Sequence, residues 1–459
     1  MFYWYSHSNL FQLMIETHDV KETEEFFDNM IMEKFGKTVD QLSNFITNYK
    51  LTYTEKNIET FINIASYLQL SIQKELSIYI LDNYIMNFQF LDKICGYHCI
   101  QDVIEKLCGD VNFLKDNQLL YLSYYVNLQE LYCHSSISNV GIVHCKELVK
   151  IKINGSLITT CENIANTLEE LELTNAINID NTALEKCYKI KSLKIVNNYK
   201  ITTCEPFSKS LIKLTLEKCL MNGSSLLLCD KIQYLNVNFY EKLILCDPFA
   251  ETLIELHAKN SLSINDESIK NCTKIQKLIL CENSFITNFS PFSKSLLHLN
   301  VYNCDINDEM IKDCHFIEYL NVTYNYNITT CKPFAKSLKT LIAHYCSMDD
   351  NGLQDCTVLQ ELRASTNRKI TTCEPFSKSL KILSIHQYFD VSKCNNVEIL
   401  IIKFECDSLY FKPFYENLIE LHCEEFLYKK VIKHDLYKFK KLKKIHFEKN
   451  HKNYIIELI

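Results

Sequence analysis

The sequence predicts an α/β solenoid with a parallel sheet on its concave face, preceded by a small, mostly helical N-terminal domain. The phrase ITTCEPFSKSL at residues 370–380 returns at 201–211 and, with two changes, at 328–338; looser copies complete a series with steps of 42 or 43 residues. A shorter apolar pattern returns every 21 or 22 residues within that series. The chain has only 7 Gly and 6 Pro, which leaves little room for long flexible connections. Patterns that return at a fixed period indicate structural units stacked on copies of themselves.

The shorter pattern is L-x-x-L-x-L-x-x-N/C, the consensus of the leucine-rich repeat. Residues 338–346 and 359–367 are two clear copies. We expect positions 1, 4 and 6 of each copy to point into the core and the L-x-L segment to form one strand. Asn or Cys at position 9 can then bond the backbone where the chain turns. About sixteen copies are predicted, and they begin at Leu128, Leu148, Leu168, Ile190, Leu211, Ile232, Leu253, Ile275, Leu296, Ile317, Leu338, Leu359, Leu380, Val397, Leu418 and Leu442.

The segments between the copies alternate between two types, which explains the longer period. In one type a Pro precedes a Phe. We expect this Pro to begin a short helical turn and the Phe to fill the core. In the other type a Cys stands three residues before the next copy, where a small buried side chain would fit. The phenylalanines are Phe207, Phe249, Phe292, Phe334, Phe376 and Phe414, and the cysteines are Cys145, Cys187, Cys229, Cys272, Cys314, Cys356 and Cys394.

Segments 304–322 and 346–364 each contain two cysteines that flank a short acidic stretch and lead into the next copy. They resemble the cysteine-containing leucine-rich repeats of F-box adaptors of ubiquitin ligases, although the stretch between the cysteines is shorter here. Together with the phrase ITTCEPFSKSLK, the array looks like the leucine-rich-repeat proteins of amoeba-infecting giant viruses. These resemblances imply a protein that recognises other proteins and acts in ubiquitin transfer.

Residues 38–81 resemble the second half of a BTB/POZ domain. The match rests on Asn57 and Ile58, on Ala65, and on the run from Tyr67 to Leu70. This resemblance implies a module that recruits a cullin. The opening strands of that family and its Ala-His-Lys/Arg segment have no clear counterpart in residues 1–37, so dimerisation and cullin binding do not follow directly. The alternative is a helical cap that shields the first repeat from water.

The predicted domain organisation is an N-terminal domain over residues 1–118 and the repeat array over 119–459. Spacing loosens after residue 388, and the segment near 429–459 is rich in Lys. Altered length and a polar outer face are typical of the cap that closes a solenoid. We therefore expect a C-terminal cap there.

Charge and cysteine usage indicate an intracellular protein without a nucleic-acid or membrane partner. The net charge of −7 gives no reason to expect binding to nucleic acid or to an anionic membrane. The chain begins without the basic and apolar regions of a signal peptide, and it has no apolar run long enough to cross a membrane. We therefore expect the 22 cysteines to be reduced thiols. The predicted location is the cytoplasm (the host cytoplasm if the protein is viral) or the nucleus.

No sequence motif predicts catalysis. The chain lacks G-x-G-x-x-G, the P-loop, H-E-x-x-H and G-x-S-x-G. Cys95, His98, Cys99 and Cys108 could in principle hold zinc, but core packing is the favoured interpretation for them in a chain rich in Cys. We therefore expect no enzyme, no cofactor and no metal site.

The candidate binding residues lie at positions 3, 5, 7 and 8 of the copies, which should face solvent on the concave side. From Ile232 to Leu359 these positions are rich in Tyr, His, Asn and Arg, a composition typical of protein interfaces. The alternative is that Tyr and Asn are common throughout the chain. The predicted function is a substrate-binding adaptor of a cullin-type ubiquitin ligase, or else a leucine-rich-repeat scaffold without a ubiquitin link. The candidate residues are Tyr234, Phe239, His257, His298, Tyr302, Tyr319, Asn321, Tyr324, His344, Tyr345 and Arg363.

Overall fold

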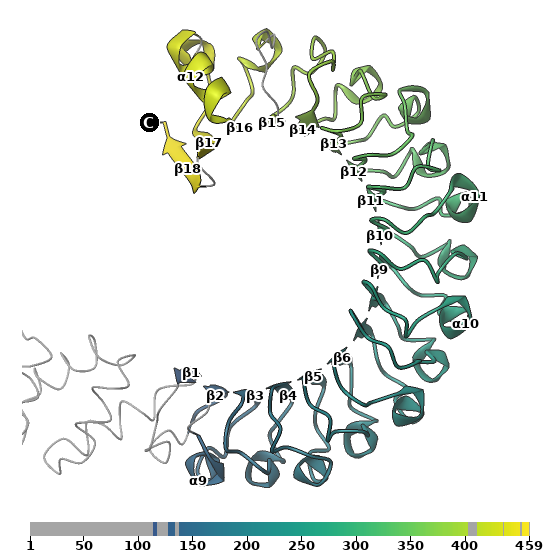
Figure 1. The fold of residues 1–459 in the computed structure, drawn as a ribbon, viewed down its shortest axis with the longest axis vertical. Coiled ribbons are helices and arrows are strands. Elements are labelled where there is room, and N and C mark those ends of the chain that lie inside the picture. Colours follow the sequence, from purple (N-terminus) through teal and green to yellow (C-terminus); the bar gives the residue numbers. More distant parts are fainter. Residues whose placement is uncertain are drawn as a thin grey trace, which may run out of the picture. The chain divides into compact units, whose positions relative to one another are not determined.

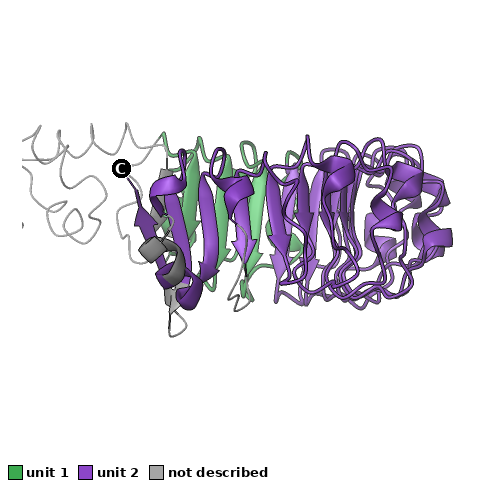
Figure 2. Cartoon of the chain, turned by 90° about the horizontal axis from the view of Figure 1, so that it is seen from above, with its two compact units in different colours: residues 1–189 green, residues 190–459 purple. Residues whose placement is uncertain are grey.

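The computed structural model describes residues 113–116, 127–133, 137–402, 411–434, 436–449 and 452–458. The chain forms two compact units, residues 1–189 and 190–459, which have different colours in Figure 2. The BTB/POZ-like segment lies outside the described part, and so do the four candidate zinc ligands Cys95, His98, Cys99 and Cys108. The division at residue 118 therefore stays a prediction. No helix in the described part is both long and apolar enough to cross a membrane.

The described part of the first unit is a small parallel sheet with helical turns on one side. Strand β1 pairs with β2, β2 with β3 and β3 with β4, all in parallel. The strands are β1 (Phe113–Asp116), β2 (Glu130–Cys133), β3 (Lys150–Asn154) and β4 (Glu170–Thr174), and the helices are α9 (Asn139–Ile142) and the 3-10 turns η3 (Glu162–Ile164) and η4 (Thr182–Leu184).

The second unit is a longer parallel sheet that curves, with strands on the inner side of the arc and helical turns on the outer side (Figure 1). Its strands are β5 (Ser192–Val196), β6 (Lys213–Glu217), β7 (Tyr234–Asn236), β8 (Glu255–His257), β9 (Lys277–Ile279), β10 (His298–Asn300), β11 (Tyr319–Asn321), β12 (Thr340–Ile342), β13 (Glu361–Arg363), β14 (Ile382–Ile385), β15 (Ile399–Ile402), β16 (Glu420–Glu424), β17 (Lys444–Lys449) and β18 (Lys452–Glu457). Strand β18 runs antiparallel to β17, whereas the other neighbours are parallel.

Short helices connect the strands of the second unit on its outer side. They are η5 (Glu205–Phe207), η6 (Gly223–Leu226), η7 (Asp247–Phe249), α10 (Asp266–Ile269), η8 (Ser290–Phe292), α11 (Asp308–Ile311), η9 (Lys332–Phe334), η10 (Asn351–Leu353), η11 (Glu374–Phe376), η12 (Lys412–Phe414), α12 (Glu425–His434) and η13 (Leu436–Lys438). The last helix of appreciable length, α12, precedes β17 and β18, as we expect of a capping segment, and the cap over residues 429–459 stays a prediction.

The predicted leucine-rich-repeat solenoid is confirmed. Each of the sixteen copies contributes one strand, β2 to β17, and that strand begins at position 3 of its copy. In the copy that begins at Leu338, positions 1, 4 and 6 (Leu338, Leu341 and Ala343) are fully buried. The register pairs equal positions of neighbouring copies, for example Leu320 with Leu341. Because each repeat buries its leucines against the next one, the core is continuous within each unit.

Position 8 of the copies has a backbone conformation that the sequence did not reveal. It lies in the left-handed region, where most side chains are disfavoured and Gly and Asn are tolerated best. Gly155 has φ 63° there, and nine other copies have φ between 46° and 61° with Asn, Lys, Glu or an aromatic residue. These residues are Asn175, Asn197, Lys218, Phe239, Asn260, Glu282, Asn303, Tyr324 and Tyr345. From Gly155 to Tyr345 the repeat therefore imposes this turn on Gly, Asn, Lys, Glu and aromatic residues alike, whereas Thr366 and Gln387, at position 8 of the next two copies, do not have positive φ.

At position 9, buried asparagines bond the backbone of neighbouring turns, as predicted. Asn325 is fully buried. Its Nδ2 donates to Val301 O at 2.6 Å and to Val322 O at 3.1 Å, and its Oδ1 accepts from Cys304 N at 3.3 Å and Ile306 N at 3.1 Å. These bonds satisfy backbone groups that the strands leave unpaired.

The recurrent phrase forms the outer half of every second turn, and its residues act as scaffold. Thr371 is held from the preceding turn, because Asp350 accepts from its amide at 2.8 Å and from its hydroxyl at 2.6 Å. Pro375 lies in the first turn of η11, and Phe376 is buried in the core. The Ser379 hydroxyl donates to Leu359 O at 2.7 Å. The predicted roles of the Pro and the Phe are confirmed.

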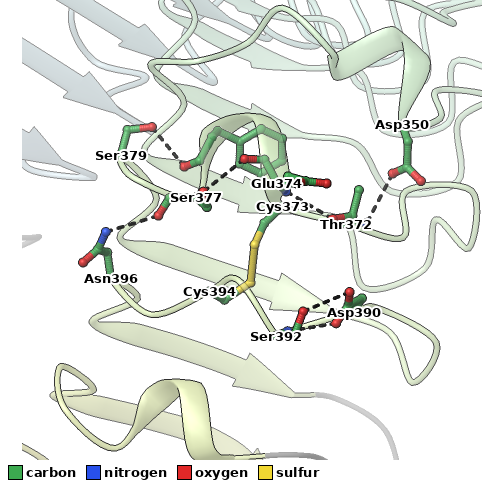
Figure 3. The surroundings of a disulfide bond; sticks show 11 residues. Asp350, Thr372, Cys373, Glu374, Ser377, Ser379, Asp390, Ser392, Cys394 and Asn396 are labelled. Atoms are coloured by element: carbon green, nitrogen blue, oxygen red, sulfur yellow. Dashed lines mark hydrogen bonds between the residues drawn. A yellow bond between two sulfur atoms is a disulfide. The ribbon is translucent and has the colours of Figure 1, made fainter.

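The Cys of the recurrent phrase (Cys204, Cys331 or Cys373) meets, inside the stack, a Cys that stands three residues before a copy (Cys229, Cys356 or Cys394). Cys204 interacts with Cys229 and Cys331 with Cys356, and these thiols are free and buried. At one pair the expectation of reduced thiols is wrong, since Cys373 and Cys394 form a disulfide (Figure 3). The connection between these two cysteines is shorter than in the other pairs, with a separation of 21 residues. The sulfur atoms meet because consecutive turns stack directly on one another.

Candidate partner-binding face

The concave face of residues 190–459 is built from positions 3 and 5 of each copy, which lie in its strand. Successive residues of a strand point to opposite faces, so Leu320 is buried in the core while Tyr319 and Asn321 are half-buried on the concave side. Because the strands are parallel and in register, equal positions of neighbouring copies lie side by side. A side chain at position 3 or 5 can therefore contact its counterparts in the next copies.

Two pairs of rings are in contact across strands, one stacked and one tilted. His298 of β10 and Tyr319 of β11 are register partners, and their ring centroids lie 3.8 Å apart with planes only 4° from parallel. Tyr234 of β7 and His257 of β8 lie 5.2 Å apart in a tilted arrangement. Between these pairs, Glu255 lies 2.5 Å from His257 Nε2 and 2.8 Å from Lys277 Nζ. The four predicted rings thus share a row of neighbouring strands with two charged residues that were not predicted, Glu255 and Lys277.

Three tyrosines form a second row where the chain leaves the strands, which we name the tyrosine ladder. Tyr324 packs edge-to-face on Tyr302, with ring centroids 5.4 Å apart, and stacks on Tyr345 at 4.8 Å with planes 3° from parallel. Tyr324 and Tyr345 both occupy position 8 and both have positive φ. Tyr345 is 45% exposed, so this edge of the ladder is open to a partner.

Further along the sheet is a hollow of about 330 Å³. Arg363 lies in it and bonds its neighbour Glu361, whose Oε1 is 2.5 Å from the Arg363 Nε. The hollow combines the Arg363 guanidinium with apolar side chains, an arrangement that suits a partner chain with anionic and apolar groups. It is lined by His344, Arg363, Ser365, Ile382, Ser384, Ile399, Ile401 and His422.

Burial sets the charge of the concave rings. It lowers the pKa of His298 to about 4, and the nearby Lys277 adds to this effect. Burial also raises the pKa of Tyr319 above its ordinary value. Both rings of the stack are therefore uncharged near neutral pH. An uncharged, half-buried stack contributes apolar contact area with polar edges, as at many protein interfaces.

Two cysteines of the core, Cys145 and Cys314, lack the properties of nucleophiles. Burial raises the pKa of Cys145 to about 11 and the pKa of Cys314 to about 12. The thiolate is the reactive form, so these thiols are inert near neutral pH. Packing is the role that their burial supports.

The structure brings most of the predicted site residues together but leaves two aside. Phe239 lies apart from the ladder, 5.7 Å from the Lys259 amine. The Asn321 side chain turns back and accepts from the Thr323 amide at 3.1 Å. The prediction missed the residues of the hollow beyond Arg363. Reading positions 3 and 5 in the copies that begin at Leu380, Val397 and Leu418 would have found Ile382, Ser384, Ile399, Ile401 and His422.

No protein-family model matches the chain, and no curated protein sequence matches it. Several solved structures do. An internalin from Listeria monocytogenes is 19% identical over 61% of this chain and 88% of that chain, with a TM-score of 0.48. A leucine-rich-repeat protein from Leptospira interrogans is 17% identical over 73% of this chain and 97% of that chain, with a TM-score of 0.49. TLR13 in a complex with ssRNA13 is 15% identical over 70% of this chain and 55% of that chain, with a TM-score of 0.39.

Proposed function

We propose that this chain is a protein–protein interaction scaffold that holds a protein partner on the concave face of residues 190–459. The tyrosine ladder is the observation that carries the proposal. Tyr side chains present a large, rigid contact area with a polar tip, and they dominate the energetics of many interfaces. Three of them in mutual contact, at the open edge of a concave sheet, offer a partner a continuous anchor.

The fold itself does not require tyrosine in the ladder. Other copies carry Asn260, Glu282 and Asn303 in the same turn at position 8, with the same sign of φ. An aromatic residue in that conformation is less favourable than Asn or Gly. Stacking between the tyrosines returns about as much stability as this strain costs, so stability does not explain why Tyr and not Asn occupies these positions, which supports a role in binding.

The test compares the wild-type protein with the triple variant Tyr302→Asn, Tyr324→Asn, Tyr345→Asn. Asn is the residue that other copies already carry in this turn, so the variant is expected to fold. The matched control is Tyr199→Asn, since Tyr199 is 58% exposed and lies outside the ladder. We expect proteins that copurify with the wild type and with the control to be lost from the triple variant. Equal recovery with all three proteins would exclude the ladder as the binding site.

A more specific proposal is that the scaffold presents its partner to a cullin-type ubiquitin ligase. It rests on the resemblance of segments 304–322 and 346–364 to F-box adaptor repeats and of residues 38–81 to a BTB/POZ module. Deletion of residues 1–118 should then abolish copurification of a cullin while partners of the concave face remain bound. A scaffold without a ubiquitin link is the alternative, and full-length protein that recovers no cullin would favour it.

The cytoplasmic location belongs to the same proposal. Reduced, buried cysteines such as Cys204 and Cys229 are compatible with it. The Cys373–Cys394 disulfide is more typical of an oxidising compartment. Fractionation of cells that express the full chain separates the two possibilities.

A further inference from the structure

Three side chains on β16 and β17 bring metal-ligating atoms together on the concave face. Glu420 and His422 are two residues apart on β16 and point to the same side of the sheet. His446 on β17 is the register partner of His422. One carboxylate oxygen and two imidazole nitrogens lie within 4.8 Å of one another. The cluster thus unites positions 3 and 5 of one copy with position 5 of the next.

Hydrogen bonding does not account for this cluster. Glu420 Oε2 lies 3.5 Å from His422 Nε2, at the outer limit of a hydrogen bond, and 3.8 Å from His446 Nε2, beyond that limit. The His446 Nε2 atom is shielded from solvent and has no hydrogen-bond partner. A polar atom in that situation calls for a further ligand, and an ion is one that fits.

We propose that Glu420, His422 and His446 bind a Zn²⁺ ion. Zinc takes imidazole nitrogen and carboxylate oxygen at about 2.0–2.2 Å in a tetrahedron, which places ligand atoms about 3.3–3.5 Å apart. The distance from Glu420 Oε2 to His422 Nε2, 3.5 Å, agrees with that spacing, and the distance to His446 Nε2, 3.8 Å, exceeds it by about 0.3 Å. The two imidazole rings stack at 4.2 Å with planes 3° from parallel, so binding of a common ion requires at least one ring to turn about its Cβ–Cγ bond until the two Nε2 atoms converge.

The site has three protein ligands and therefore one open coordination position, as in zinc sites that bind water or an oxygen ligand. His422 also lines the hollow that contains Arg363. A group bound in the hollow thus lies next to the ion. The cluster differs from a cysteine site in having only nitrogen and oxygen donors, which gives it a distinct spectroscopic signature with Co²⁺ in place of zinc.

The test titrates the full-length, metal-free protein with Co²⁺ and then with Zn²⁺, under reducing conditions. Tetrahedral Co²⁺ bound by nitrogen and oxygen gives visible bands without the thiolate charge-transfer bands of a cysteine site. The variants are His446→Gln and Glu420→Gln, and the control is His344→Gln, which changes another histidine of the same hollow. We expect wild type and control to bind one equivalent of metal that both variants bind at least tenfold more weakly.

Two results would overturn the proposal. One is a wild-type protein that does not give the Co²⁺ spectrum of nitrogen and oxygen ligands, and the other is a pair of variants that bind the metal with unchanged affinity. Thermal unfolding in chelator shows whether each variant is folded. If His446→Gln does not fold, the isosteric Glu420→Gln decides, since it removes only the carboxylate charge. Zinc should also raise the melting temperature of the wild type and the control, but not that of the variants.

Discussion

Replacement of Asn325 by Ala removes a buried amide that bonds the backbone of two turns. The amide groups of Cys304 and Ile306 lose their acceptor, and Val301 O loses a donor at 2.6 Å. Each buried backbone group left without a partner costs about 1–3 kcal/mol. Water that enters the space recovers part of this cost. We therefore expect Asn325→Ala to lower the free energy of unfolding by about 3–5 kcal/mol, a large effect for one substitution.

The matched control is Asn321→Ala, four residues away. Asn321 is half-buried, and its Oδ1 accepts from the Thr323 amide at 3.1 Å within the same turn. Its loss should cost about 1 kcal/mol or less. Urea unfolding followed by circular dichroism gives both values, and hydrogen exchange at Cys304 and Ile306 locates the damage, because repeats can open locally. Equal shifts in the two variants would refute the role given to the buried asparagine.

Three further predictions concern the core, the concave stack and the disulfide. Gly352→Ala places a Cβ 2.1 Å from Thr329 O, so it should lower the melting temperature markedly, whereas Gly223→Ala, with its nearest atom at 3.3 Å, should change it little. Folding lowers the pKa of His298 from 6.5 to about 4, so between these pH values the unfolded chain binds a proton that the folded chain does not. The free energy of unfolding should therefore be highest above pH 6.5 and decrease as the pH drops toward 4, and the decrease should be smaller in His298→Gln. Alkylation of denatured, unreduced protein should spare Cys373 and Cys394, and their modification would contradict the disulfide.

The sequence predicts the periodic part of the fold because the spacing of the apolar residues repeats with the structural unit. Leu338 and Leu341 recur in a spacing that only a stack of short strands can bury, and Phe376 follows a Pro that starts a turn. The left-handed turn at position 8 was not predicted, because Tyr324 and Tyr345 are poor markers of positive φ, although Gly or Asn at position 8 of five other copies is a signal for it. The disulfide was also missed, because spacing along the chain does not reveal which two cysteines of neighbouring turns come into contact.

The concave site was likewise predicted only in part. That Tyr319 and His298 share a face follows from strand alternation, and both were predicted. Their stacking depends on the register between neighbouring copies, and so do the contacts within the tyrosine ladder and the cluster of Glu420, His422 and His446. The consensus predicts this register only where every copy in the chain is aligned. The predicted concave residues end at Arg363, three copies before the histidine cluster.

Position 8 separates what the fold needs from what binding would need. The turn there has positive φ in every case from Asn175 to Tyr345, so the backbone is set by the repeat and not by the side chain. Asn satisfies that backbone at little cost, whereas an aromatic residue adds about 1 kcal/mol of strain. Tyr324 and Tyr345 occupy consecutive copies and stack on each other, and their contact returns about 0.5–1.5 kcal/mol. Contact and strain nearly cancel, so Tyr324→Asn should leave stability almost unchanged. A large loss of partner binding in that variant would then report the interface alone.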